Sequence, residues 1–187
     1  MNYRILVINL GSTSTKAAVF ENEQLIWESK IEHSIKELTS FPSIVSQKEY
    51  RQELILSALK NGNIELNSLS AIAARGGLLK PLISGTYRIN QSMVDALINT
   101  KRGEHASNLC AIIAFDLGNQ QGIPSYIVDP VSVDELEDVA RISGMAEIER
   151  TSIFHALNHK AIGRRVAFDH QTKYEQLNLI IAHLGSG

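Results

Sequence analysis

The chain has 187 residues, 44% of them hydrophobic and 20% charged, and its 18 basic and 20 acidic side chains give a formal net charge of −2. That hydrophobic content suffices for a sizeable buried core, which excludes wholesale disorder. The near-neutral charge gives no reason to expect nucleic acid or an acidic membrane surface as a partner. The single cysteine, Cys110, excludes an internal disulfide and a four-cysteine zinc site, and its apolar surroundings predict a core position.

Targeting signals and membrane spans are not evident in the sequence. No apolar run approaches the roughly 18 residues that a membrane span needs, and the N-terminal stretch lacks the pattern of a secretory signal. We therefore expect a soluble, cytoplasmic protein of one domain, or of one domain and part of another. Residues 180–187 form an apolar run that leads into glycines, which predicts a buried strand without a following neighbour.

The expected elements alternate along the chain. Short apolar runs bounded by turn formers predict strands at residues 5–10, 17–20, 25–31, 70–74, 125–128 and 177–183. Apolar residues at helical spacing predict helices at residues 44–59, 91–100, 106–121, 133–143 and 155–169. Because strands cluster first and then alternate with helices, we expect an α/β fold with a mixed sheet.

The segment 9–16, Asn-Leu-Gly-Ser-Thr-Ser-Thr-Lys, joins two expected strands. It lacks the glycine spacing of a Walker loop or of a dinucleotide fingerprint. An ordinary hairpin rich in turn formers explains it. Equally, its small and hydroxyl residues leave backbone N–H groups open to anionic oxygens, and Lys16 adds a positive charge. The residues alone leave both interpretations open.

Arg75 and Asp129 each follow an expected strand, at the end where an open α/β sheet binds ligands. A guanidinium there can hold a carboxylate or phosphate through two hydrogen bonds. The commoner interpretation of Arg75 is a surface arginine before the flexible turn Gly76-Gly77. Asp129 precedes Pro130, and taken alone it is a turn residue.

The histidines give weaker signals. His155 and His159 lie four residues apart and share a face if their segment is helical. Ala156 stands where the metalloprotease motif needs Glu, which argues against a zinc hydrolase. His105 and His183, taken singly, are expected to be structural rather than catalytic.

Segment 9–16 and its flanking strands resemble the first phosphate hairpin of the acetate and sugar kinase, heat-shock chaperone and actin superfamily. Its carboxylate-kinase branch has Asn at the position of Asn9, where most of the superfamily has Asp. Further matches follow in order at residues 74–81, 84–87, 103–109, 127–131, 154–160 and 182–185. The run Arg-Gly-Gly-Leu-Leu-Lys-Pro within the first of these is similar to that of butyrate kinases. The resemblance covers nearly the whole chain.

This resemblance implies a ribonuclease-H-like mixed sheet flanked by helices at residues 1–130. Residues 131–187 would be the truncated start of a second, similar domain. The implied activity is reversible transfer of the γ-phosphoryl group of ATP to a short-chain carboxylate such as butyrate, giving an acyl phosphate and ADP, with Mg²⁺ as cofactor.

The resemblance also implies roles for particular residues. Arg75 would hold the substrate carboxylate, His155 would donate a hydrogen bond to the phosphoryl oxygens, and Asp129 would lie beside the metal. There is no intrinsic metal site, and Mg²⁺ would bind in the region of Asn9 and Asp129. The implied phosphate- and nucleotide-binding residues are Asn9, Gly11, Ser12, Thr13, Ser14, Lys16, His183, Gly185 and Gly187.

General chemistry agrees with these roles. A loose phosphoryl transition state needs positioning and hydrogen-bond donors around its spread charge, and little covalent help. A carboxylate acceptor is ionised at neutral pH and needs no general base.

Two alternatives stay open at this point. The first alternative is a different acceptor acid: acetate, propionate or a branched-chain acid. The volume of the acceptor pocket decides between these acids, and a pocket distinguishes two acids that differ by one methylene by only about 1 to 3 kcal/mol. A non-catalytic nucleotide-switch domain with the same fold is the second alternative, although a switch has no need of Arg75. The family's adenosine pocket, a second arginine and a magnesium carboxylate lie beyond Gly187. We therefore expect the chain alone to be inactive, and the intact enzyme to be a homo-oligomer.

Overall fold

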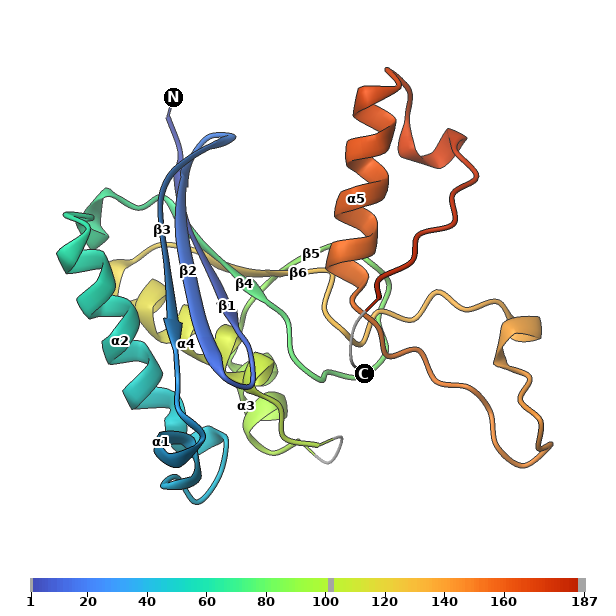
Figure 1. Ribbon diagram of the computed structural model, residues 1–187, viewed down its shortest axis with the longest axis horizontal. Helices are drawn as coiled ribbons and strands as arrows, with labels where there is room; N and C mark the ends of the chain where they lie inside the picture. Colours follow the sequence, from blue (N-terminus) through green and yellow to red (C-terminus); the bar gives the residue numbers. More distant parts are fainter. Residues whose placement is uncertain (1, 101–102, 185–187) are drawn as a thin grey trace.

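A mixed β-sheet forms the body of the protein in the computed structural model, which describes residues 2–100 and 103–184. The strands of the described residues follow the spatial order β3-β2-β1-β4-β6-β5 (Figure 1). They are β1 (Arg4–Leu10), β2 (Ser14–Glu21), β3 (Gln24–Glu32), β4 (Ala71–Arg75), β5 (Thr86–Arg88) and β6 (Ser125–Val128). β1, β4 and β6 run parallel, whereas β2, β3 and β5 are antiparallel to their neighbours.

Helices begin after β3 and are interspersed with the later strands β4, β5 and β6. They are α1 (Ile35–Thr39), α2 (Lys48–Asn61), α3 (Gln91–Ile98), α4 (Ala106–Gln121) and α5 (Ala156–Asp169). Short 3₁₀ turns occupy Val45–Gln47, Leu66–Ser68, Asp138–Arg141 and Tyr174–Gln176. α4 packs against β1, β4 and β6, and α2 packs against β2 and α4 (Figure 1).

The alternation of side chains along β1 decides which residues face these helices. Leu6, Ile8 and Leu10 are fully buried beneath them. Asn9 lies between Ile8 and Leu10 and therefore faces the other side of the sheet. The predicted core position of Cys110 is confirmed, because this residue of α4 has no exposed surface.

Most expected elements are confirmed. The α/β class, the mixed sheet, the meander β1-β2-β3 and the strand at Ser125–Val128 all appear. Two short elements, α1 and β5, were not predicted from apolar runs. β5 has three residues, Thr-Tyr-Arg, and therefore carries no apolar pattern.

The helix expected at residues 133–143 is wrong. Only the 3₁₀ turn Asp138–Arg141 forms there. Val133 instead makes a parallel bridge with Leu82, and the Asp134 N–H donates to the Leu82 carbonyl over 2.9 Å. A long-range pairing of the backbone thus replaces the local helical hydrogen bonds that the apolar spacing predicted.

The strand expected at residues 177–183 is also wrong. A strand needs a hydrogen-bonded neighbour, and residues 177–184 pair with no strand in the part of the chain that the structure describes. Ile181 instead packs toward α5, where an added Cβ at Gly163 would lie 3.2 Å from the Ile181 Cδ1 atom.

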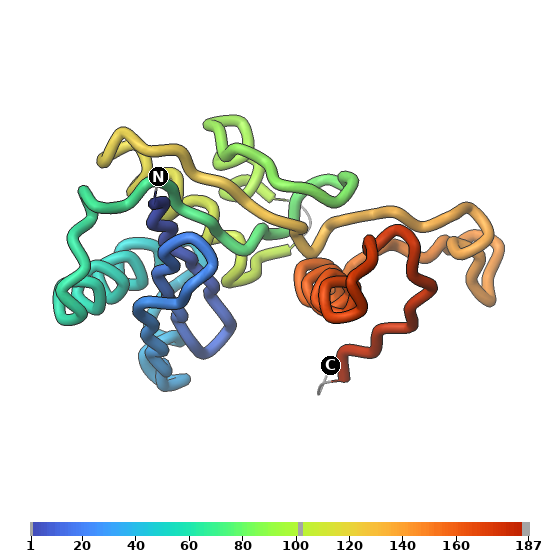
Figure 2. Tube along the Cα trace, turned by 90° about the horizontal axis from the view of Figure 1, so that it is seen from above, coloured from blue at the N-terminus to red at the C-terminus, as the bar shows by residue number. Residues whose placement is uncertain are grey.

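Residues 131–184 project away from the sheet, as two perpendicular views show (Figures 1 and 2). The main hydrophobic cluster, by contrast, runs from Leu6 to Ile127. Large apolar side chains stay exposed in the projecting segment, among them Ile142, Ile162 and Phe168. In the described part of the chain, no helix combines the length and the apolar character needed to cross a membrane.

Candidate phosphate and carboxylate site

Three expected site residues lie at neighbouring strand ends. In the parallel pair β1 and β4, Ile8 is opposite Ala74, so Asn9 and Arg75 occupy the next positions of the two strands. In the pair β4 and β6, Arg75 is opposite Val128, and Asp129 follows directly. Because parallel strands end at the same edge of a sheet, these residues share one edge, as the sequence predicted.

The turn that follows Arg75 is packed rather than flexible. Gly76 and Gly77 are both buried. An added Cβ at Gly76 would lie 3.0 Å from the Pro130 Cα atom and closer still to its Cβ. At Gly77 it would lie 2.7 Å from the Asn108 Cα atom. The expectation of a flexible turn after Arg75 is therefore wrong, because two other segments hold this turn in place, and Arg75 itself is partly exposed.

Asp129 is buried, and each of its carboxylate oxygens accepts a hydrogen bond. Its side chain has no exposed surface, and its backbone has a φ of +38°, in the left-handed region. Oδ1 accepts from the Gly85 N–H at 2.8 Å, and Oδ2 accepts from Arg164 Nη1 at 3.2 Å. The carboxylate thus ties the end of β6 both to the segment before β5 and to α5.

Two histidines meet where α5 begins. His155 is the N-cap residue of α5, and its ring meets the His183 ring edge-on with the centroids 4.5 Å apart. His159 lies one turn further along α5, with its ring centroid 5.9 Å from that of His183. Burial lowers the pKa of His155, and the positive charge of Arg75 lowers it further. Both effects favour the neutral form of the His155 imidazole.

His105, which was expected to be structural, lies at the start of α4. It is the N-cap residue of α4, and its Nδ1 accepts from the Ser107 N–H at 3.1 Å. In the neutral ring the proton therefore lies on Nε2. Burial and the charge of Arg75 both lower the pKa of His105. The sequence contained one indication of a role for His105, because it lies in segment 103–109, which resembles the carboxylate kinases.

The β1–β2 turn presents hydrogen-bond donors to solvent. Ser12 and Thr13 are exposed, and in the described structure their backbone N–H groups and hydroxyls donate to no protein atom. The Gly11 N–H donates to the Ser14 carbonyl at 2.9 Å and closes the turn. The turn thus has the free donors that an anionic oxygen requires.

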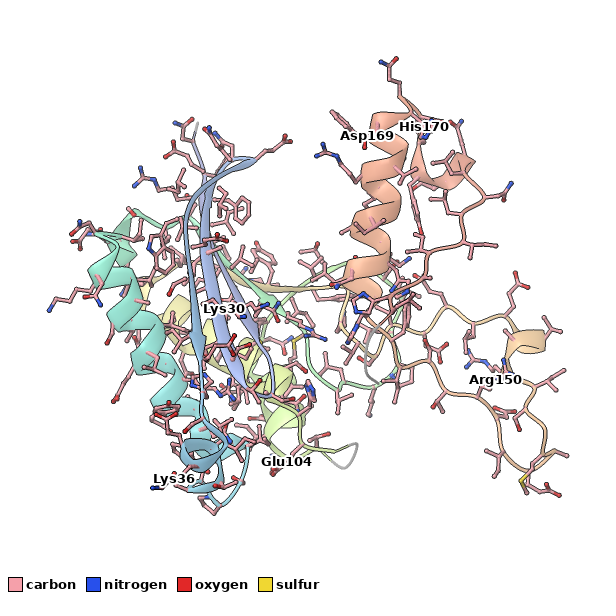
Figure 3. All side chains as sticks on the ribbon, in the orientation of Figure 1. Lys30, Lys36, Glu104, Arg150, Asp169 and His170 are labelled. Carbon is pink, nitrogen blue, oxygen red and sulfur yellow. The ribbon has the colours of Figure 1, made fainter. Side chains whose placement is uncertain are left out.

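Asn9 and Lys16 lie side by side on the open face of the sheet, because they pair across β1 and β2. They line a depression of about 520 Å³, together with Glu28 and Lys30 of β3. Figure 3 labels Lys30 on this face. Within the described residues, no hydrogen bond or ion pair joins this group or the turn to Arg75, Asp129 or His155. Gly185 and Gly187 lie outside the described residues.

The expected magnesium region does not offer an open ligand set. No cluster of three or more His, Cys, Asp or Glu side chains among the described residues suits a metal ion. Asp129 has the right chemistry for Mg²⁺, but both of its oxygens already accept from protein donors and neither is exposed. These residues therefore do not fit a directly bound Mg²⁺ in this arrangement.

Solved structures define the class of fold. The acetate kinase of Porphyromonas gingivalis superposes with a TM-score of 0.63 at 15% identity, over 93% of this chain and 50% of that one. A propionate kinase from Francisella tularensis gives a TM-score of 0.56 at 16% identity, over 91% of this chain and 50% of that one. The chain therefore has the fold found in acetate and propionate kinases. No protein-family model matches it.

Curated relatives narrow the class. Butyrate kinase 1 of Clostridium acetobutylicum is 52% identical over 185 residues, which cover 99% of this chain and 52% of the relative. A probable butyrate kinase of Coprothermobacter proteolyticus is 50% identical over 188 residues, covering 100% of this chain and 53% of the relative. The chain is thus homologous to the butyrate kinases and corresponds to their N-terminal half. It spans about half the length of the curated relatives it matches.

Proposed function

We propose that this chain supplies one wall of the active site of a butyrate kinase. The reaction is the reversible transfer of the γ-phosphoryl group of ATP to the carboxylate of butyrate, which gives butyryl phosphate and ADP. The observation that carries the proposal is the meeting of Asn9, Arg75 and Asp129 at adjacent strand ends. The similarity to butyrate kinases, with 52% and 50% sequence identity, supports butyrate as the acceptor.

Arg75 binds the acceptor carboxylate in this proposal. Its guanidinium stays charged at every relevant pH and matches the two oxygens of a carboxylate. The packed glycines that follow it fix the backbone from which it projects. A carboxylate held in this way attacks the phosphorus without losing a proton, so the site needs no general base.

His155 and His105 donate to the phosphoryl group as it moves. In its neutral form His105 carries its proton on Nε2, the nitrogen that does not contact Ser107. Burial and the charge of Arg75 lower the pKa of both imidazoles, which favours their neutral, hydrogen-bond-donating form. Donors placed around spread negative charge are what a loose phosphoryl transition state requires.

The turn at residues 11–14 binds phosphate oxygens of ATP through its free donors, and Lys16 adds positive charge nearby. Mg²⁺ supplies charge neutralisation for the nucleotide phosphates in this class of enzyme. Since Asp129 is already hydrogen-bonded on both oxygens, we assign Mg²⁺ to the nucleotide and water rather than to a preformed protein site.

We propose that the chain has two structural units, residues 1–130 and 131–187. We also propose that neither the second unit nor the chain alone has kinase activity. The hydrophobic cluster ends at Ile127, and the exposed apolar side chains of the projecting segment need a further layer to cover them. An active enzyme therefore requires the half of the relatives that this chain does not match.

The test is an acyl phosphate assay, with hydroxylamine trapping, on a chimaera. In this chimaera the chain replaces the matching 52% of butyrate kinase 1. Acetate, propionate, butyrate and isobutyrate are compared as acceptors. We expect butyryl phosphate from the chimaera and none from the purified chain alone. A folded chimaera that phosphorylates no acid would refute the carboxylate kinase assignment, a preference for another acid would correct the acceptor, and activity of the chain alone would show that the catalytic groups are misplaced.

A further inference from the structure

Arg51 is a fully buried arginine that the proposed reaction does not use. It lies in the first part of α2, has no exposed surface, and is the largest fully buried side chain of the described residues. Arginine is almost never fully buried without partners. In the described structure no carboxylate forms an ion pair with it. Its hydrogen-bond partners are all neutral groups.

Most of these partners are carbonyl groups of the β1–β2 turn. Nη1 donates to the carbonyls of Gly11 and Ser14, each at 3.1 Å, and Nη2 donates to the Ser12 carbonyl at 3.2 Å. Nη1 also donates to the Thr15 hydroxyl at 3.3 Å. The remaining donor, Nε, is held by Gln47 Oε1 at 3.0 Å. The Arg51 guanidinium thus donates hydrogen bonds to three carbonyls of the turn from its buried side.

The backbone of the turn is polarised as a result. The remaining carbonyl, that of Thr13, accepts from the His33 N–H at 2.9 Å, so each carbonyl of residues 11–14 accepts a hydrogen bond from within the protein. The N–H groups of Ser12 and Thr13 have no protein acceptor within the described residues, and both residues are exposed. Inward carbonyls and outward donors make a turn that favours an anion.

The charge of Arg51 acts in the same direction. The guanidinium remains ionised even though burial lowers its pKa. Since its hydrogen-bond acceptors are neutral, its positive charge is not cancelled beneath the turn. Such a charge attracts a phosphate through the thin layer of backbone between them.

Neutral groups complete the layer beneath the turn. The Thr15 hydroxyl lies 2.8 Å from His33 Nε2, and His33 Nδ1 lies 3.2 Å from the Tyr50 hydroxyl. Burial, followed by the charge of Arg51, lowers the pKa of His33. His33 is thus neutral beside the guanidinium, and a second buried cation is avoided.

We infer that Arg51 is the positioning residue of the phosphate turn: it binds the carbonyls of Gly11, Ser12 and Ser14 from inside and thereby directs the free N–H groups toward the phosphates of the nucleotide. This inference rests on the proposed function, because it deepens the role of the same turn. Arg51 itself touches neither ATP nor the acceptor.

The first measurement is amide hydrogen exchange of the 187-residue chain. The reporters are the Gly11 N–H, bonded to the Ser14 carbonyl, and the His33 N–H, bonded to the Thr13 carbonyl. In Arg51→Met we expect both to exchange at least about tenfold faster, because the turn opens locally. The Ile72 amide in β4 is the reference, and its exchange stays unchanged. Equal acceleration at all three amides, or at none, would overturn the inference.

The second measurement is titration of the same chain with inorganic phosphate, followed by the backbone amide resonances of Ser12 and Thr13. We expect shifts in the unsubstituted chain, a loss of about 10- to 100-fold in affinity for Arg51→Met, and partial rescue by Arg51→Lys, which restores charge but not the fork. Thr15→Val removes a single hydroxyl and provides a milder variant if Arg51→Met fails to fold. It should weaken binding in the same direction.

Lys48→Met is the matched control. Lys48 is a cation of the same helix, but it forms its ion pairs with Glu49 and Asp116 and not with the turn. It should leave the exchange of Gly11 and the phosphate affinity unchanged. Phosphate shifts that survive Arg51→Met would overturn the positioning role alone. Absence of shifts in the unsubstituted chain would overturn the phosphate role of the turn, which belongs to the proposed function, and the exchange experiment would still decide whether Arg51 holds the turn.

Discussion

Substitution of Gly76 by alanine tests whether the turn after Arg75 is held by close packing. The added Cβ would lie 3.0 Å from the Pro130 Cα atom and 3.3 Å from the Ile127 Cδ1 atom, and closer to the Pro130 Cβ. Neither a proline ring nor a backbone atom moves aside easily, so β4 and the segment after β6 must separate. Overpacking of this kind lowers the free energy of unfolding by about 1 to 3 kcal/mol. Alanine also restricts the unfolded chain, which raises the free energy of unfolding by about 0.4 to 1 kcal/mol. Because the clash is with a proline ring and a backbone atom, the cost falls in the upper part of its range, and we expect a net loss of about 2 kcal/mol.

Urea unfolding of the chain, followed by circular dichroism, measures this loss. In thermal unfolding, Tm should fall by about 4 to 8 °C, at about 2 to 4 °C per kcal/mol for a chain of this size. Gly144→Ala is the control, because an added Cβ there meets no atom within 4 Å. It should leave stability unchanged or raise it slightly. If the two variants unfold at the same urea concentration, the packing argument for the fixed position of Arg75 is wrong.

Four further predictions concern the site and its surroundings. In the chimaera, Arg75→Ala should raise the KM for butyrate and lower kcat, and Arg75→Lys should rescue poorly because the fork is lost; near-normal kinetics with Lys would contradict the assignment. His155→Ala should lower kcat by about 10² to 10³ with little change in KM, as for loss of one oxyanion donor, whereas an effect on KM alone would make His155 a binding residue. Burial raises the pKa of the Cys110 thiol to about 11, so a thiol reagent should label it only after urea unfolding, and rapid labelling of the folded chain would contradict the buried position. Because the pKa of His33 is lowered in the folded state, the unfolded chain takes up its proton first, and stability should fall as the pH drops below the ordinary value of 6.5; this decline should be smaller in His33→Gln, and an equal decline would assign it to other groups.

The sequence determined the parts of the fold that depend on local pattern. The meander β1-β2-β3, the buried helix α4 and the strand β6 follow from apolar periodicity and turn residues within each segment. The sequence also located Arg75 and Asp129 at strand ends. Because parallel strands end at one edge, this local information was enough to predict their neighbourhood.

Tertiary structure alone decided the contacts that join distant segments. Apolar spacing at residues 133–143 favoured a helix, but pairing of Val133 and Asp134 with Leu82 satisfied the backbone in another way. Nothing local marked Arg51, which is 40 residues from Gly11 in the chain and looks like any exposed helical arginine in the sequence. A guanidinium shows its role only when the fold buries it, because its hydrogen bonds then have to be satisfied by whichever groups the fold brings beside it.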